Sequence, residues 1–129
     1  MSIGQNSRLI AIVDDDEALQ SALQDLIESE GLSTLCFGSA EQFLDSDARH
    51  KAACLIADIR MPGMSGLELQ AKLKAERCRI PIIFITAHGD AKTRILAMRD
   101  GAVEFLTKPF DETALLEIVH GVVRRSGND

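Results

Sequence analysis

The chain has 129 residues, 46% of them hydrophobic and 26% charged, which is typical of one soluble globular domain with its own core. Its formal charge is −6 at pH 7 and no lysine or arginine block stands out, so we expect no nucleic-acid contact by this domain. The sequence has no secretory signal and no apolar run of about 18 residues, which predicts a cytoplasmic protein without membrane contact. The three cysteines lack CxxC spacing and are expected to be small buried residues: Cys36, Cys54 and Cys78.

Five apolar, β-branched runs recur along the chain, and a helical pattern follows each of them. Several runs do not alternate with polar residues, which suits strands buried on both faces of a parallel sheet. The pattern predicts an α/β fold of the (βα)5 type: a doubly wound, five-stranded parallel sheet with helices on both faces. We expect a single domain over residues 1–129 with a core of about residues 8–124. The predicted strands are 9–13, 32–37, 54–59, 82–85 and 103–106.

The helix ends carry their own signals. Serine followed three residues later by glutamine or glutamate predicts a capping box, at Ser39 with Gln42 and at Ser65 with Glu68. The first and last helical patterns each carry one apolar stripe, which we expect to lie on the sheet. Single aspartates predict other N-caps and glycines predict helix C-termini: Asp16, Asp90, Asp111, Gly31 and Gly101.

Acidic residues lie where two of the predicted strands end. In the stretch "LIAIVDDDEAL" the first apolar run is followed by Asp14, Asp15 and Asp16, and Asp58 lies at the end of the third run. In a doubly wound sheet, ligands bind beyond the carboxyl ends of the strands. Two like charges 4 Å apart repel by about 4 kcal/mol at an effective dielectric of about 20, so such a cluster is costly without a counter-charge. Helix capping accounts for Asp16 but not for Asp58, whereas a Mg²⁺ ion held by carboxylates accounts for the group.

The other two strand ends carry a hydroxyl and an ammonium group. Thr86 follows the fourth run, and Lys108 follows the fifth. Together with Mg²⁺ they would surround a phosphoryl group with positive charge and a hydrogen-bond donor. The chemistry that fits is transfer of a phosphoryl group to Asp58, which would form an aspartyl phosphate.

Four segments, "IVDDDEAL", "LIADIRMPGMSGLEL", "IIFITAHGD" and "GAVEFLTKPF", resemble the signature segments of response-regulator receiver domains, the phospho-accepting half of two-component systems. The resemblance covers residues 8 to 124, and the sequences of the last two segments are most similar to those of FixJ-type regulators. It implies a CheY-like fold with strand order 2-1-3-4-5. It also implies a signalling domain rather than an enzyme, with intrinsic self-phosphorylation and autodephosphorylation chemistry.

The resemblance implies a role for each matching position. Asp58 matches the phosphorylated aspartate, Asp15 a direct Mg²⁺ ligand and Asp14 the acid that holds metal-bound water. At Arg60 the backbone carbonyl would complete the metal shell. Lys108 matches the lysine that contacts the phosphoryl group.

Further positions match the parts that respond to phosphorylation. Thr86 matches the switch hydroxyl and Phe105 the aromatic switch position, here without a tyrosine hydroxyl. Arg60 and His88 fall at positions that tune dephosphorylation, and the Lys108-Pro109 bond is similar to one that is cis in the family.

The implied partners are a sensor histidine kinase and, after phosphorylation, a second copy or an output domain. The face formed by the fourth helix, fifth strand and fifth helix would control dimerisation or a C-terminal DNA-binding output domain outside this chain, for transcription regulation. The sequence leaves open whether the receiver stands alone or is part of a longer regulator. Three alternatives also stay open: a haloacid-dehalogenase-type phosphohydrolase, a flavodoxin-like binding module and a receiver that signals without phosphorylation.

Overall fold

A computed structural model describes residues 8–87 and 89–127 of the chain. His88, a position expected to tune dephosphorylation, lies outside the described residues. The helices and strands alternate along the chain: β1 Leu9–Val13, α1 Glu17–Glu28, β2 Ser33–Phe37, α2 Ala40–Asp45, the short 3₁₀ helix η2 Ala48–His50, β3 Cys54–Ala57, α3 Gly66–Ala75, β4 Ile82–Thr86, α4 Ala91–Arg99, β5 Glu104–Thr107 and α5 Glu112–Gly127.

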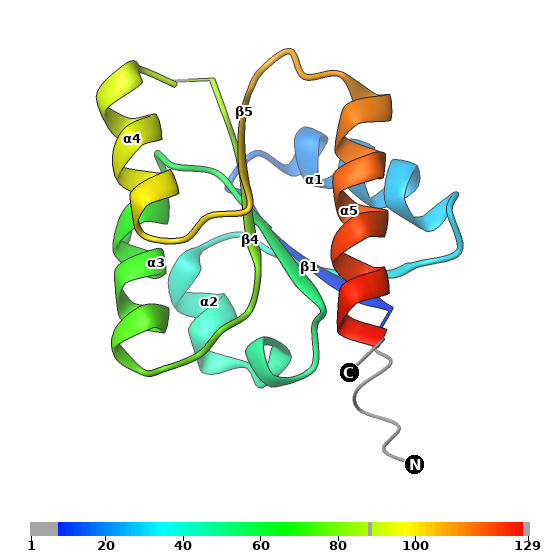
Figure 1. Cartoon of the computed structure of the whole chain (residues 1–129), viewed down its shortest axis with the longest axis horizontal. Coiled ribbons are helices and arrows are strands. Elements are labelled where there is room, and N and C mark those ends of the chain that lie inside the picture. Colours follow the sequence, from blue (N-terminus) through cyan, green and yellow to red (C-terminus); the bar gives the residue numbers. More distant parts are fainter. Residues whose placement is uncertain (1–7, 88, 128–129) are drawn as a thin grey trace.

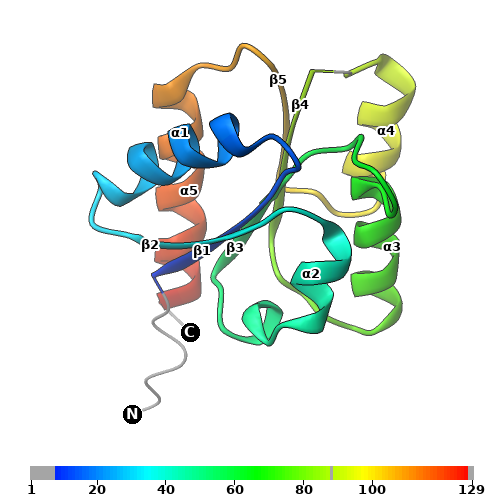
Figure 2. The same ribbon diagram turned by 180° about the vertical axis from the view of Figure 1, so that it is seen from behind.

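The five strands form one parallel sheet in the order β2-β1-β3-β4-β5, which confirms the predicted fold class and strand order. Helices α1 and α5 cover one face of the sheet, and α2, α3 and α4 cover the other (Figures 1 and 2). The strand that follows β1 in the chain, β2, lies on one side of it, and β3 lies on the other side. The strand order therefore switches between β1 and β3, and the carboxyl ends of these two strands lie at the switch point.

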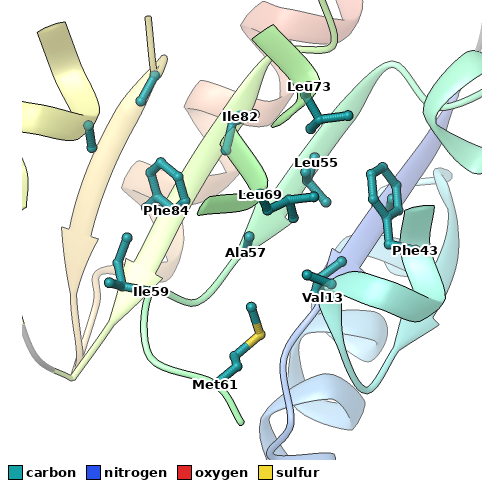
Figure 3. Close-up of a cluster of buried hydrophobic side chains, with 14 of the residues drawn as sticks. Val13, Phe43, Leu55, Ala57, Ile59, Met61, Leu69, Leu73, Ile82 and Phe84 are labelled. Carbon is teal, nitrogen blue, oxygen red and sulfur yellow. The ribbon is translucent and has the colours of Figure 1, made fainter. Parts of the chain in front are cut away.

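The central strands send alternate side chains into two separate cores. In β3, Leu55 and Ala57 enter the core under α2, α3 and α4, whereas Cys54 and Ile56 enter the core under α1 and α5. Figure 3 shows the first core, in which Phe43 of α2 and side chains of α3 pack against the inner strands. Burial on both faces explains why these strands read as continuous apolar runs.

The strand boundaries differ by a few residues from those predicted. β3 ends at Ala57 rather than at residue 59. The Asp58 side chain bends back onto the backbone, where its Oδ1 accepts a hydrogen bond from Ile59 N at 2.6 Å. β5 covers Glu104–Thr107, one residue later than predicted, and β2 begins at Ser33 rather than at residue 32. β2 and β5 are the edge strands and are less buried than the inner three.

Most predicted helix caps are confirmed. Asp16, Asp90 and Asp111 accept backbone hydrogen bonds at the N-termini of α1, α4 and α5, and Ser65 with Glu68 makes a complete capping box. Only one of the two hydrogen bonds of the capping box predicted at Ser39 is present. The Ser39 side chain accepts from Gln42 N, but Gln42 Oε1 accepts from Gly38 N one residue further out. Gly31 and Gly101 have φ values of 82° and 105°, as expected after a helix end.

Helix α4 buries fewer residues than the other long helices. Ala97 is its one buried residue, and Met98 packs partly against the same core. Gln70, a buried residue of α3, donates from Nε2 to Ala97 O at 3.0 Å. This hydrogen bond adds a polar contact to the small apolar contact of α4.

Of the three cysteines, only Cys54 is fully buried, and Cys36 and Cys78 are half-buried, so the expectation of buried thiols holds for one of them. All three are free. Among the described residues, no helix combines the length and apolar character that a membrane span requires.

Candidate functional site

The sheet register brings the predicted acidic residues together. Val13, the last residue of β1, pairs with Ala57, the last residue of β3. Asp14 and Asp58 follow these two residues, and Asp58 N donates to Val13 O at 3.1 Å, which extends the ladder by one step. The two carboxylates therefore leave neighbouring strands at the same edge of the sheet.

A third carboxylate joins this pair. Oxygen atoms of Asp14, Asp15 and Asp58 all lie within 4.8 Å of one another. Asp14 and Asp58 are buried and Asp15 is exposed, so the cluster has a protected floor and one side open to solvent. Oxygen donors in this number and arrangement suit a hard divalent cation such as Mg²⁺, which uses one or two carboxylates and keeps several waters.

Lys108 lies opposite the carboxylates, as predicted. Its Nζ is 3.2 Å from Asp58 Oδ2 and 3.5 Å from Asp14 Oδ2. The Lys108-Pro109 peptide bond is cis, and Lys108 N donates to Thr86 O at 2.9 Å. The Lys108 ammonium group therefore faces both buried carboxylates from the end of β5.

Burial and charge act in opposite directions on these groups. Burial raises the pKa of Asp14; the Asp16 N–H and the Lys108 charge lower it in part, and the neighbouring Asp58 and Asp15 charges raise it further. For Lys108, burial lowers the pKa, but the charges of Asp14 and Asp58 outweigh burial and hold it above its usual value. Burial therefore disfavours the negative charge of Asp14 when no added cation is present.

Thr86 and Phe105 lie on the two strands next to the acidic cluster. Thr86 is the last residue of β4, is fully buried and pairs in the sheet with Thr107. Phe105 is also buried, with its ring centroid 6.3 Å from that of Phe84. Phe105 is therefore a core residue in this structure, and its role as a switch stays a prediction.

Gly89, in the loop after β4, lies directly against Phe105. A Cβ atom placed on Gly89 would come within 2.4 Å of Thr107 Cγ2 and 3.0 Å of Phe105 Cε1. Glycine allows this approach without displacing either side chain, so the backbone at Gly89 lies against Thr107 and the Phe105 ring.

Three residues that support the acidic cluster were missed from sequence. Gln20 Nε2 donates to Asp14 O at 2.5 Å and to Phe37 O at 3.3 Å, which fixes the corner at the end of β1. Glu41 of α2 accepts from Met64 N at 2.9 Å and so holds the loop after Asp58. Neither contact has a spacing signal, because Gln20 is six residues from Asp14, outside the local capping and turn patterns, and Glu41 is 23 residues from Met64. Gly66, a third, would place a Cβ atom 2.2 Å from Asp58 O, so a side chain is excluded there.

Arg60 lies in the same loop, two residues after Asp58, and its side chain is exposed. The prediction for this position concerns its backbone carbonyl, which belongs to the segment that Gly66 N fixes by donating to Ile59 O at 2.7 Å. The structure thus brings together Asp14, Asp15, Asp58 and Lys108, with Thr86 and Arg60 in the segments that border them.

Comparison with known proteins gives the class of the chain. Residues 10–120 match the family model described as the response regulator receiver domain. The chain therefore belongs to the family of response regulator receiver domains, which act in phosphorylation-based two-component signalling.

Particular relatives and solved structures agree with this class. The chain is 45% identical over 122 residues to the response regulator protein TodT of Pseudomonas putida, which covers 95% of this chain and 54% of TodT. It is 37% identical over 117 residues to the transcriptional regulatory protein FixJ of Bradyrhizobium diazoefficiens, covering 91% of this chain and 57% of FixJ. The structure of the response regulator StyR has a TM-score of 0.85 and 42% identity, over 93% of this chain and 61% of StyR. That of FixJ-N has a TM-score of 0.80 and 36% identity, over 90% of this chain and 93% of FixJ-N. This chain spans about half the length of the curated relatives TodT and FixJ.

Proposed function

We propose that this domain accepts a phosphoryl group on Asp58 from the phosphohistidine of a sensor histidine kinase. An Asp58 carboxylate oxygen attacks phosphorus, the bond from phosphorus to the imidazole nitrogen breaks, and the histidine leaves with the electron pair. The observation that carries this proposal is the convergence of Asp14, Asp15, Asp58 and Lys108 at one edge of the sheet.

Mg²⁺ fits this site, since the donor set is three carboxylates with an open, solvent-facing side. Asp15 and Asp58 would hold the ion directly, Asp14 through water, and the Arg60 carbonyl would complete the shell. When bound, Mg²⁺ supplies positive charge for the transferring phosphoryl oxygens. Lys108 supports the same charge from the protein side, and its raised pKa keeps it protonated at neutral pH.

Several groups then change their interactions after transfer. A phosphoryl group on Asp58 offers new acceptors to Lys108 and to the Thr86 hydroxyl, which lies on the neighbouring strand β4. Because Gly89 packs against Phe105, a shift of the segment after Thr86 uncovers or repacks that ring. The change would reach the face formed by α4, β5 and α5, where it controls dimerisation or an output domain. The output function that we propose is transcription regulation through a DNA-binding domain, since TodT and FixJ are longer than this chain and FixJ is named a transcriptional regulator.

The direct test is phosphorylation by a small acyl phosphate. We expect the wild-type chain, mixed with acetyl phosphate and Mg²⁺, to gain one phosphoryl group by mass spectrometry, and hydroxylamine to remove it. Asp58→Asn should gain none, whereas Asp25→Asn, an exposed acid on α1 and the matched control, should react like wild type. Labelling of Asp58→Asn to the wild-type extent would refute the proposal.

The same preparation separates the alternatives. A phosphohydrolase of the haloacid-dehalogenase type would turn over p-nitrophenyl phosphate many times, whereas the proposed acceptor should release p-nitrophenol no faster than its own phospho-aspartate is hydrolysed. A flavodoxin-like protein would purify yellow. A receiver that signals without phosphorylation would stay unlabelled under all these conditions.

A further inference from the structure

The end of the sheet opposite the acidic cluster carries a surface that the proposed function does not use. Two adjoining hollows of about 600 Å³ each lie on either side of the loop of residues 76–81, between α3 and β4. One reaches Asp100 and Gly101 after α4, and the other reaches Arg49 in η2 and Arg125 in α5. They share the stretch from Arg77 to Pro81 together with Val103, so they form one continuous groove across the amino ends of the central strands, which we call the basal groove.

The basal groove combines an apolar floor with a basic rim. Its floor includes Leu73, Ile80, Ile82, Val103 and Val122. The charged side chains that line it are mostly positive, and the acidic ones are Glu76 and Asp100. The basic ones are Arg49, Lys74, Arg77, Arg79 and Arg125. This is an unusual concentration of positive charge in a chain with a formal charge of −6.

Three of these arginines are not neutralised by the protein itself. Arg49 pairs with Glu76, and Lys74 pairs with Asp100 at 3.6 Å. Within residues 8–87 and 89–127, the guanidinium groups of Arg77, Arg79 and Arg125 have no ion pair, and all three side chains are exposed. Arg49 Nε is buried without a hydrogen-bond partner among the described residues, so even the paired guanidinium is incompletely satisfied.

We propose that the basal groove binds an acidic peptide segment of a partner protein, with its carboxylates on Arg77, Arg79 and Arg125 and its apolar side chains on the floor. Arginine suits carboxylates because its planar fork can donate two parallel hydrogen bonds. Nucleic acid fits less well, because the floor of the groove is apolar and a phosphate backbone has no apolar side chains to place on it. A second copy presenting its acidic strand ends would make a head-to-tail contact, and it would cover the site of Asp58.

The test uses the full chain, labelled with ¹⁵N and titrated with a blocked peptide of alternating glutamate and leucine, six residues long. We expect saturable shifts of the amide signals of residues 77–80 and 103, and weakening at high salt. A peptide with glutamine in place of glutamate and a single-stranded oligonucleotide serve as ligand controls.

The double variant Arg77→Asn, Arg79→Gln should bind about tenfold more weakly, since two exposed pairs are lost. Asparagine is chosen because the backbone of Arg77 is left-handed, with φ 60°. Lys92→Gln on α4, away from the groove, is the matched control and should bind like wild type.

Arg125→Gln is a second variant in a regular helix, and it should weaken binding without affecting the loop fold. Asp58→Asn should bind the peptide like wild type, so a failure of phosphorylation and a failure of the basal groove give different results. No saturable shift, shifts centred elsewhere, or equal binding by the double variant would overturn the proposal. Tighter binding of the oligonucleotide, or concentration-dependent oligomers that the double variant abolishes, would overturn it in favour of those occupants.

Discussion

Asp14 is the acidic residue of the site whose charged form is disfavoured in the folded chain. It is buried beside two other acids, and burial is the main reason why its pKa is raised. The folded chain therefore favours the protonated carboxyl more than the unfolded chain does. Below the usual pKa of aspartate, about 3.9, both states are protonated and this difference contributes nothing. As pH rises above that value, the unfolded chain loses its proton first, and the folded state is progressively destabilised.

Replacing the Asp14 carboxylate should therefore stabilise the metal-free protein. We expect Asp14→Asn to raise the melting temperature by a few degrees at pH 7 with EDTA, and to show no such gain near pH 3. The same variant should bind Mg²⁺ more weakly. The melting temperature followed by circular dichroism from pH 3 to pH 7 is the measurement, with Asp25→Asn as the matched control. A gain that does not depend on pH would mean that the cause is packing rather than charge.

At the scale of elements, α4 is held by side chains that reach across to β5. Arg94 Nη1 donates to Phe105 O at 2.9 Å, and Arg94 Nη2 lies 3.7 Å from Glu104 Oε1. The same guanidinium lies 6.0 Å from the centre of the Phe105 ring. Since Ala97 is the one buried residue of the helix, we expect these contacts and the Gln70 bond to contribute to its attachment.

The contribution of this contact can be measured by a double-mutant cycle. We expect Arg94→Ala and Glu104→Ala to be coupled by about 0.5–1 kcal/mol in the free energy of unfolding, measured with urea. Arg94→Ala should also speed amide hydrogen exchange in α4 more than in α5. Arg99→Ala, an exposed arginine whose partner Asp100 directly follows it, is the control. Strictly additive effects and unchanged exchange would show that α4 is held by something else.

The sequence predicted those features of the elements that depend on local chemistry. The apolar runs, the aspartate caps and the Ser65 box are set by residues a few positions apart, and the structure confirms them. The meeting of Asp14 and Asp58 followed from the rule that parallel strands end at one edge, whereas the strand order itself came from the family resemblance. Contacts outside the local capping and turn patterns could not be predicted: Gln20 on Asp14, Glu41 on the loop after Asp58 and Arg94 on β5 have no spacing that marks them. The Ser39 box failed because a glutamine side chain reaches either of two adjacent amides.

For the whole molecule, a metal ion held by the acidic cluster would link metal binding to global stability. A ligand that binds the folded chain alone stabilises it by RT ln(1 + [L]/Kd), about 2.7 kcal/mol at one hundred times Kd. Asp15 is exposed, so its replacement would remove a proposed Mg²⁺ ligand without opening the core.

We therefore expect saturating Mg²⁺ to raise the melting temperature of wild type and EDTA to reverse the rise. In Asp15→Asn the gain should be much smaller. Asp45→Asn, an exposed acid on α2, should respond like wild type. An equal rise in all three proteins would indicate a general salt effect rather than binding at the cluster.

The position of Cys54 has a consequence for how the opening of the molecule can be observed. This residue begins β3, which lies between β1 and β4, and burial raises the pKa of its thiol to about 12. Alkylating reagents attack thiolates, so the native chain shields this sulfur both sterically and chemically. With Cys36 and Cys78 replaced by serine, the rate of iodoacetamide modification would report how often the centre of the sheet opens and exposes Cys54. No dye or tryptophan would have to be introduced.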